Sequence, residues 1–343
     1  MNVRYYTSDD HVNWNRYVAG NPDGTIFHRI EWKNIIEETF GFKSTYLIAD
    51  ENGEIVGVLP LFYIKSPFAG KCLISVPFAV YGGILAKDDI VELALLDSCA
   101  ELAESLNVDY VEFRHLNDRP KDGLTKGNPL YVTFIKTLPK NCEEIYDGLP
   151  REARRIVRKA KTYGLETRIN NSGLDDFYEL YAISVRKFGT PVFPKSLFQN
   201  CLIAFKEEAD LLMVYKDDNP VAGVLSFYHK DTAMPYYAGS LPEAWDLHPN
   251  NLMYLSLMEH AHQRGCARFD FGRSKVDSGP GKFKEHMGFE PIPLPYRYYL
   301  RNGRELPNNN PTNPKYQIGL NLWKRLPLSV TKLIGPRVVR LFP

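Results

Sequence analysis

Two lysines flank an aromatic residue in the segment SGPGKFKEHMGFEP, residues 278–291. Lys282 and Lys284 stand on either side of Phe283, and a Gly-Phe pair follows four residues after Lys284. The glycines and proline in front of the lysines predict a flexible loop, which we interpret as the mobile rim of a cleft. The pattern fits either the solvated start of a helix or the edge of an active site.

A second group of cations lies in GLPREARRIVRKAKTYGLE, residues 148–166. Pro150 opens the predicted helix and Gly164 closes it. Cations at intervals of three and four residues share one helix face and repel one another, which favours a bound phosphate or other anion. A merely solvated face remains open as the alternative. The residues at this spacing are Arg151, Arg155, Arg158 and Lys161.

A third candidate is FDFGRS, residues 269–274, at the end of a predicted strand, where α/β sheets commonly contact ligands. Arg273 can bind a carboxylate or phosphate through two hydrogen bonds. Gly272 can bend the chain so that Asp270 and Arg273 meet. An Asp-Arg pair that only braces the loop is the alternative.

The elements that must position these residues follow a repeated order. LIADENGEIVGVLPLFY in the first half matches MVYKDDNPVAGVLSFYH in the second, with a strand, an acidic-Asn turn and a second strand in each. The simplest interpretation is two copies of one α/β module with mixed, mostly antiparallel sheets flanked by helices. We predict domains at residues 1–147 and 167–305, joined by the basic helix at 148–166 and followed by a tail at 306–343. Further helices are predicted at residues 30–41, 90–107, 174–189 and 250–265.

Composition sets limits on function. The 343 residues are 44% hydrophobic, with a net charge of +1, which is typical of a globular protein and argues against coating of nucleic acid. Five scattered cysteines argue against a disulfide framework and a zinc site. The N-terminus has no apolar signal core, and no apolar run is long enough to span a bilayer. The sequence therefore predicts a cytoplasmic protein with no metal and no DNA partner.

This order of elements, the basic helix and the pattern FDFGRS…FK…G resemble the FemAB family of GNAT-fold aminoacyltransferases. The likeness extends over about residues 20–340 and looks closest to the branch associated with PEP-CTERM/exosortase systems of exopolysaccharide clusters. It is carried by PFAVYGG (77–83), residues 154–164, 269–274, Phe283-Lys284, Gly288 and PLPYRYYL (293–300).

The resemblance implies two GNAT-like domains that transfer an activated acyl group onto an amine, without a tightly bound cofactor. The attack passes through a tetrahedral oxyanion, which a cation can stabilise. Lys284 stands where many GNAT enzymes carry a tyrosine acid, and we predict Lys284 and Asp270 as catalytic. At the start of a helix, Lys284 would oppose the helix dipole. The predicted substrate-binding residues are Arg155, Arg158, Arg273, Ser274, Phe283, Lys282, Tyr237 and Tyr81.

Three functions stay open at this point. The first is transfer from aminoacyl-tRNA onto an amine of a cell-envelope, peptidoglycan-like or exopolysaccharide precursor. The second uses acyl-CoA as donor, although LHPNNLMYLSL (247–257) lacks the glycines that normally cradle its pyrophosphate. The third is a non-catalytic scaffold.

The C-terminal segment 314–343 has six basic residues, no acidic residue and many apolar ones. Such a segment fits peripheral contact with the inner face of the plasma membrane. A strap over the protein's own surface is the alternative.

Overall fold

The computed structural model describes residues 1–301, 304–306 and 314–343, with residues 314–318 described by their backbone alone. The chain divides into two compact units. Unit 1 contains Met1–Pro129, Leu294–Asn310 and Arg340–Pro343, and unit 2 contains Leu130–Pro293 and Pro311–Val339.

These bounds differ from those predicted at residues 147, 166 and 305. The predicted linker helix belongs to unit 2, where its Ala153, Val157 and Ala160 are fully buried in the hydrophobic core. The apolar stripe of this helix therefore makes it part of a domain rather than a spacer. Residues 307–313 of the predicted tail lie outside the described residues.

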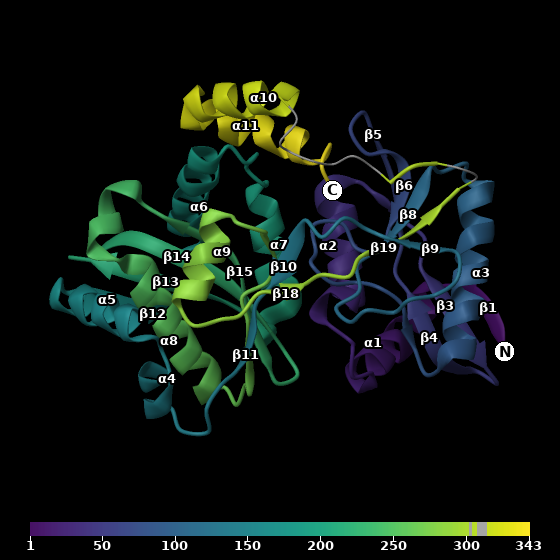
Figure 1. Cartoon of the computed structure of the whole chain (residues 1–343), viewed down its shortest axis with the longest axis horizontal. Helices are drawn as coiled ribbons and strands as arrows, with labels where there is room; N and C mark the ends of the chain where they lie inside the picture. The colour runs from purple at the N-terminus through teal and green to yellow at the C-terminus, as the bar shows by residue number, and fades with distance from the viewer. Residues whose placement is uncertain (302–303, 307–313) are drawn as a thin grey trace. The chain divides into compact units, whose positions relative to one another are not determined.

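In its described residues, unit 1 holds two sheets and three α-helices (Figure 1). As the glycine stop predicts, α2 (Ile30–Phe40) ends on Gly41, which has a φ of +67°. The other helices are α1 (His11–Gly20) and α3 (Asp89–Ser105). The four-stranded sheet has the order β1 (Asn2–Tyr5), β3 (Leu47–Glu51), β4 (Glu54–Leu59) and β7 (Leu85–Ala86). The six-stranded sheet has the order β2 (Lys43–Ser44), β5 (Phe62–Ser66), β6 (Gly70–Ile74), β8 (Tyr110–Phe113), β19 (Arg297–Leu300) and β9 (Leu124–Lys126).

Unit 2 is built on a second six-stranded sheet, in which all neighbours are antiparallel except β15 and β16. Its order is β11 (Ile135–Thr137), β16 (Arg268–Asp270), β15 (Thr232–Ser240), β14 (Asn219–His229), β13 (Ala209–Lys216) and β12 (Leu165–Ile169). A small sheet joins β17 (Ser274–Lys275), β10 (Tyr131–Thr133) and β18 (Ile292–Pro293). The mixed α/β fold class is thereby confirmed.

The helices of unit 2 pack against the sheet and against one another (Figure 1). Helix α8 (Pro249–Gln263) packs on the sheet with α4 (Glu143–Asp147) and α5 (Arg151–Thr162) beside it. Helices α6 (Leu174–Phe188) and α7 (Lys195–Phe205) pack on the strands β13 to β15, and α10 (Pro314–Arg325) and α11 (Leu328–Val339) pack on α6. Helix α9 (Gly279–His286) follows β17. Among the described residues, no helix combines the length and apolar character needed to cross a membrane.

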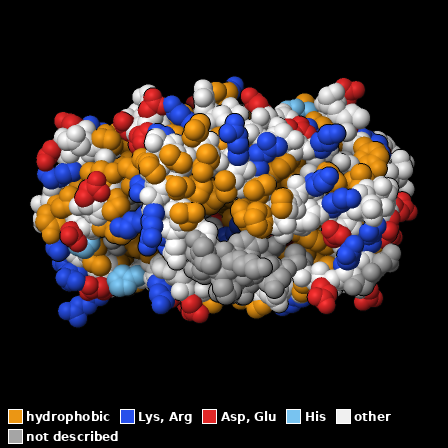
Figure 2. Space-filling model, turned by 90° about the horizontal axis from the view of Figure 1, so that it is seen from above, with side chains coloured by type: hydrophobic (Ala, Val, Ile, Leu, Met, Phe, Trp, Pro, Cys, Tyr) orange, Lys and Arg blue, Asp and Glu red, His pale blue; other side chains and the backbone are white. Residues whose placement is uncertain are grey.

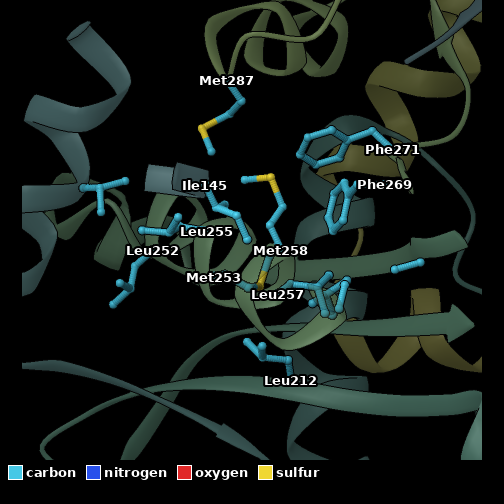
Figure 3. Packing of buried hydrophobic residues seen from close by; sticks show 14 of the residues in the cluster. Ile145, Leu212, Leu252, Met253, Leu255, Leu257, Met258, Phe269, Phe271 and Met287 are labelled. Atoms are coloured by element: carbon cyan, nitrogen blue, oxygen red, sulfur yellow. The ribbon is translucent and has the colours of Figure 1, made fainter. Parts of the chain in front are cut away.

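The core of unit 2 anchors the segment around α9. Figure 3 shows methionines and leucines of α8, including Met253 and Met258, packed together with Phe269 and Phe271 at the end of β16. Met287, directly after α9, is fully buried in the same cluster. The end of β16 and the end of α9 are therefore fixed by one hydrophobic core.

Strands β15 and β16 pair only at their beginnings. Their register joins Thr232 to Arg268 and Ala233 to Phe269, after which β15 continues to Ser240 with β14 alone. A register shift between Leu225 and Ser226 marks an irregularity opposite this part of β15. After Phe269 the chain no longer pairs with β15, although Asp270 still pairs with Ile135 of β11 and the Phe271 N–H donates to the Phe134 carbonyl at 2.9 Å. The carbonyl groups on the β15 side are therefore available for other partners.

The close approach of α6 to β15 gives a test of the packing. A Cβ atom on Gly239 would lie 2.4 Å from backbone atoms of Leu180 and Tyr181, so Gly239→Ala should lower the free energy of unfolding by about 3 kcal/mol. Gly20→Ala at the end of α1 is the matched control, because nothing lies within 4 Å of its added Cβ. Urea unfolding measures both, and equal midpoints for the two variants would contradict the packing described.

Candidate active site

Helix α9 carries Lys284 in its last turn. Ser278 caps its first turn by accepting a hydrogen bond from the Gly281 N–H at 3.2 Å, so the Gly-Pro-Gly sequence forms helix where we predicted a mobile loop. The expected helix-start position of Lys284 is also wrong. A cation in the last turn of a helix is favoured by the helix dipole rather than opposed by it.

The ammonium group of Lys284 is buried and held by backbone carbonyls. The side chain is only 9% exposed. Its Nζ donates hydrogen bonds to the carbonyl oxygens of Phe271 at 2.8 Å, Gly272 at 2.9 Å and Arg273 at 3.4 Å. Three successive carbonyls thus take up the three N–H bonds of the ammonium, the last of them at a length that marks a weak bond.

The surroundings of Lys284 shift its proton affinity. Nζ lies 5.2 Å from the ring centre of Phe134 and 5.8 Å from that of Phe271. Burial lowers the pKa of Lys284 to about 7, although the negative charge of Asp270 raises it and Arg273 lowers it further. At neutral pH this amine therefore exists in both protonation states, which suits a group that stabilises charge or moves a proton.

Asp270 organises the chain that supplies these carbonyls. It is 2% exposed, and its Oδ1 accepts hydrogen bonds from the Gly272 N–H at 2.7 Å and the Thr133 hydroxyl at 3.3 Å. Gly272 has a φ of +65°, a conformation that glycine adopts without strain. The predicted bend at Gly272 is present, and it turns the carbonyls of residues 271–273 toward Lys284.

Arg273 and Ser274 continue from this bend. The guanidinium of Arg273 lies 4.5 Å from the ring centre of Tyr131, and the side chain is half-buried. Ser274 is buried, and its hydroxyl has no hydrogen-bond partner among the described residues. A buried hydroxyl without a partner is costly, so Ser274 offers a contact that a polar ligand atom could satisfy.

The neighbours of Lys284 on α9 differ in their surroundings. Lys282 is exposed, whereas Phe283 is half-buried with its ring centre 5.6 Å from that of Tyr254 on α8. Phe283 therefore packs α9 onto α8, and only Lys284 of the two lysines enters the protein.

The basic helix α5 lies apart from this arrangement in sequence but in the same unit. Arg155 is exposed and forms an ion pair with Glu152, whereas Arg158 is exposed with no carboxylate partner among the described residues. Burial together with the cations Lys159 and Arg155 lowers the pKa of His248, the residue before α8. The positive charge of α5 therefore reaches the N-terminal end of α8.

The two tyrosines predicted for substrate binding are both buried. Tyr237 packs in an aromatic cluster with Tyr181 and Phe198 of α6 and α7, and its hydroxyl has no described partner. Tyr81 lies in unit 1 beside a cavity of about 10 Å³, which is too small for a ligand. Neither tyrosine shares a described contact with Lys284, and their roles stay predictions.

Sequence reasoning did not identify several residues of the site. Tyr131 and Thr133 lie in β10, and Phe134 lies between β10 and β11. All three are far in sequence from FDFGRS and meet it through the pairing of β11 with β16 and of β10 with β17. The role of the backbone carbonyls at 271–273 cannot be predicted from side-chain types, except that a glycine at 272 allows a bend. Within the described part of the chain, no three His, Cys, Asp or Glu side chains gather as metal ligands.

Comparison with known proteins assigns the fold. Residues 150–285 match the model of the acetyltransferase (GNAT) domain. The crystal structure of FemX superposes with a TM-score of 0.69 at 18% identity and covers 93% of this chain and 99% of that one. A tandem GNAT protein from the clavulanic acid biosynthesis pathway gives 0.55 at 12% identity, with 89% and 100% covered. The prediction of two tandem GNAT-like domains is confirmed.

Sequence comparison finds relatives with a named enzymatic activity. A lipid II:glycine glycyltransferase of Staphylococcus haemolyticus (strain JCSC1435) is 23% identical, covering 84% of this chain and 87% of that protein. One from Staphylococcus aureus (strain MRSA252) is 24% identical, with 84% and 88% covered. These relatives and the FemX structure support the resemblance of this chain to the FemAB family. The narrower PEP-CTERM branch stays a prediction.

The lowered pKa of Lys284 makes a prediction about stability. Unfolded lysine titrates near 10.5, so between pH 7 and 10.5 the unfolded chain binds more protons than the folded one at this position. The contribution of Lys284 to the free energy of unfolding must then rise with pH between pH 7 and 10.5. Relative to Lys284→Met, the free energy of unfolding of the wild type should gain about 1.4 kcal/mol for each pH unit above pH 7. Denaturant titrations at several pH values measure this difference, and a constant difference would contradict the lowered pKa.

Proposed function

We propose that the protein is an aminoacyltransferase that forms an amide on an amine of a cell-envelope precursor. The observation that carries the proposal is the buried Lys284 ammonium on the carbonyls of residues 271–273, within the part of the chain that matches the GNAT domain. The named activity of the staphylococcal relatives, glycyl transfer involving lipid II, supports a peptidoglycan-type precursor as acceptor.

The reaction joins the acceptor nitrogen to the donor carbonyl carbon. The amine attacks the ester carbonyl, the C–N bond forms, and the carbonyl oxygen becomes an oxyanion. Lys284 turns its weakest hydrogen bond, the one to the Arg273 carbonyl at 3.4 Å, toward that oxyanion. The C–O bond then breaks, the leaving hydroxyl takes up a proton, and the nitrogen loses one.

The proton transfers suit the pKa of Lys284. A group with a pKa of about 7 can give a proton to the leaving oxygen and regain one from the nitrogen at little cost near neutral pH. Asp270 holds Gly272 and so keeps the carbonyls of the site in place. We assign Asp270 this positioning role, rather than direct contact with the substrate.

The donor is proposed to be aminoacyl-tRNA. The N-terminal end of α8 begins with Pro249 and lacks a glycine-framed loop, so backbone N–H groups for a coenzyme A pyrophosphate are few. Helix α5 packs on α8, and after burial its Lys159 and Arg155 contribute to the lowered pKa of His248 at this end of α8. Arg158, Arg155 and Arg273 are then the side chains proposed to hold the phosphates of the donor.

Replacing Lys284 tests its role. Lys284→Met keeps the length of the side chain and removes the charge, so transfer should fall by about 10²-fold or more, the effect of losing one oxyanion donor. Lys206→Met, at an exposed lysine, is the matched control. The assay measures transfer of a labelled amino acid from aminoacyl-tRNA, with labelled acyl-CoA in parallel, to an envelope-precursor extract. Full activity in Lys284→Met would overturn the assignment, and transfer from acyl-CoA alone would overturn the proposed donor.

The donor site on α5 has its own test. Arg158→Glu places an acid where a phosphate should bind, so KM for the donor should rise on the order of fivefold, with kcat unchanged. The increase should shrink as salt is raised. Arg168→Glu on β12 introduces the same charge change at an arginine already paired with Glu166 and Asp218. If KM changes equally in both variants, the effect comes from the overall charge of the protein, and the proposal of a donor site on α5 is wrong.

A further inference from the structure

The C-terminal helices α10 and α11 are fixed on unit 2 by one face. Trp323 donates a hydrogen bond from Nε1 to the Thr190 carbonyl at 3.1 Å. Gly335 lies against Val192, because a Cβ there would come within 2.7 Å of its carbonyl oxygen. Thr331 and Val339 are buried, and Lys332 forms an ion pair with Glu179 of α6. These contacts support the interpretation of the segment as a strap over the protein's own surface.

The opposite face of the two helices is apolar and cationic. Leu322 is 63% exposed and Leu333 is 70% exposed, whereas the other apolar side chains described in these two helices are buried or half-buried. Each stands one helical turn from an exposed arginine, Leu322 from Arg325 and Leu333 from Arg337. Figure 2 looks onto this end of unit 2 and shows hydrophobic side chains gathered beside Lys and Arg side chains.

The charges of this outer face are uncompensated. Arg325 and Arg337 are exposed, and neither has a carboxylate partner among the residues that the structure describes. Lys324 is exposed as well, but its side chain runs past Gly189 on the side that packs on unit 2. The sequence from 314 to 343 contains six basic residues and no acidic one. Exposed cations with leucines between them match a partner surface that presents both anionic groups and an apolar layer.

We propose that the outer face of α10 and α11 docks the protein on an anionic lipid bilayer. The helices would lie in the plane of the headgroups, with Leu322 and Leu333 inserted and Arg325 and Arg337 on lipid phosphates. A second copy of the chain fits less well, because a symmetric contact would set the same cations against each other. This inference goes beyond the proposed function, and it holds for any acceptor.

Flotation with lipid vesicles tests the proposal without donor or acceptor, so that the result is independent of catalysis. The full-length wild type should float with phosphatidylcholine vesicles that contain about one third phosphatidylglycerol, and far less with phosphatidylcholine alone. Raising the salt concentration should weaken this binding. A wild type that fails to float with the anionic vesicles overturns the proposal.

Two pairs of variants locate the surface. Arg325→Glu with Arg337→Glu should weaken binding about 25-fold, since each cation near an anionic membrane contributes about fivefold. Lys43→Glu with Lys206→Glu changes the net charge equally at exposed sites elsewhere and should bind like the wild type. Equal loss in both double variants overturns the proposal.

The apolar contribution is tested in the same way. Leu322→Ser with Leu333→Ser should weaken binding about tenfold. Ile90→Ser with Ile203→Ser is the matched control, because these side chains are 72% and 63% exposed elsewhere. Circular dichroism and thermal unfolding confirm that each variant is folded. A dimer in size-exclusion chromatography that only the leucine variant dissociates would make this face a self-association surface and overturn membrane docking.

Discussion

The candidate site depends on one interaction, the hydrogen bonds from the Lys284 ammonium to the carbonyls of residues 271–273. A buried cation is tolerated only where its N–H groups find acceptors, and burial is the largest cause of the lowered pKa of this lysine. The early end of β15–β16 pairing, the bend at Gly272 and the anchoring of α9 by Met287 all serve to present those carbonyls. A change in any of these three features would alter the surroundings of the Lys284 amine.

Much of this arrangement could be predicted from local sequence. The glycine at 41 ends α2, Pro150 and Gly164 bound α5, and the turn at residues 51–53 joins β3 to β4. Each is a short-range signal, because one residue's backbone preference decides the outcome. The spacing of Lys284 to the Gly-Phe pair is a signal of the same kind, and the resemblance to the FemAB family rests on such patterns together with the order of elements.

The rest could not be predicted because it depends on long-range pairing. The sequence SGPG favours a loop, yet the Ser278 cap and the burial of Met287 turn it into the first part of a helix. That outcome moves Lys284 from the expected start of α9 to its last turn. The neighbours Thr133 and Phe134 come from a segment more than 130 residues away along the chain, and no local pattern links them to Asp270.

Strand β19 has a consequence for the order in which the chain can fold. It lies between β8 and β9 in the sheet of unit 1, although it follows the whole of residues 130–293 in the sequence (Figure 1). Unit 1 therefore cannot complete its sheet on the ribosome until residue 300 has emerged, by which time residues 130–293 of unit 2 are already synthesised. Antiparallel pairing of β10 with β18 holds the two ends of that inserted stretch together. The chain thus resembles a domain insertion, in which the inner unit can fold first and bring together the two segments of the outer unit that flank it in sequence.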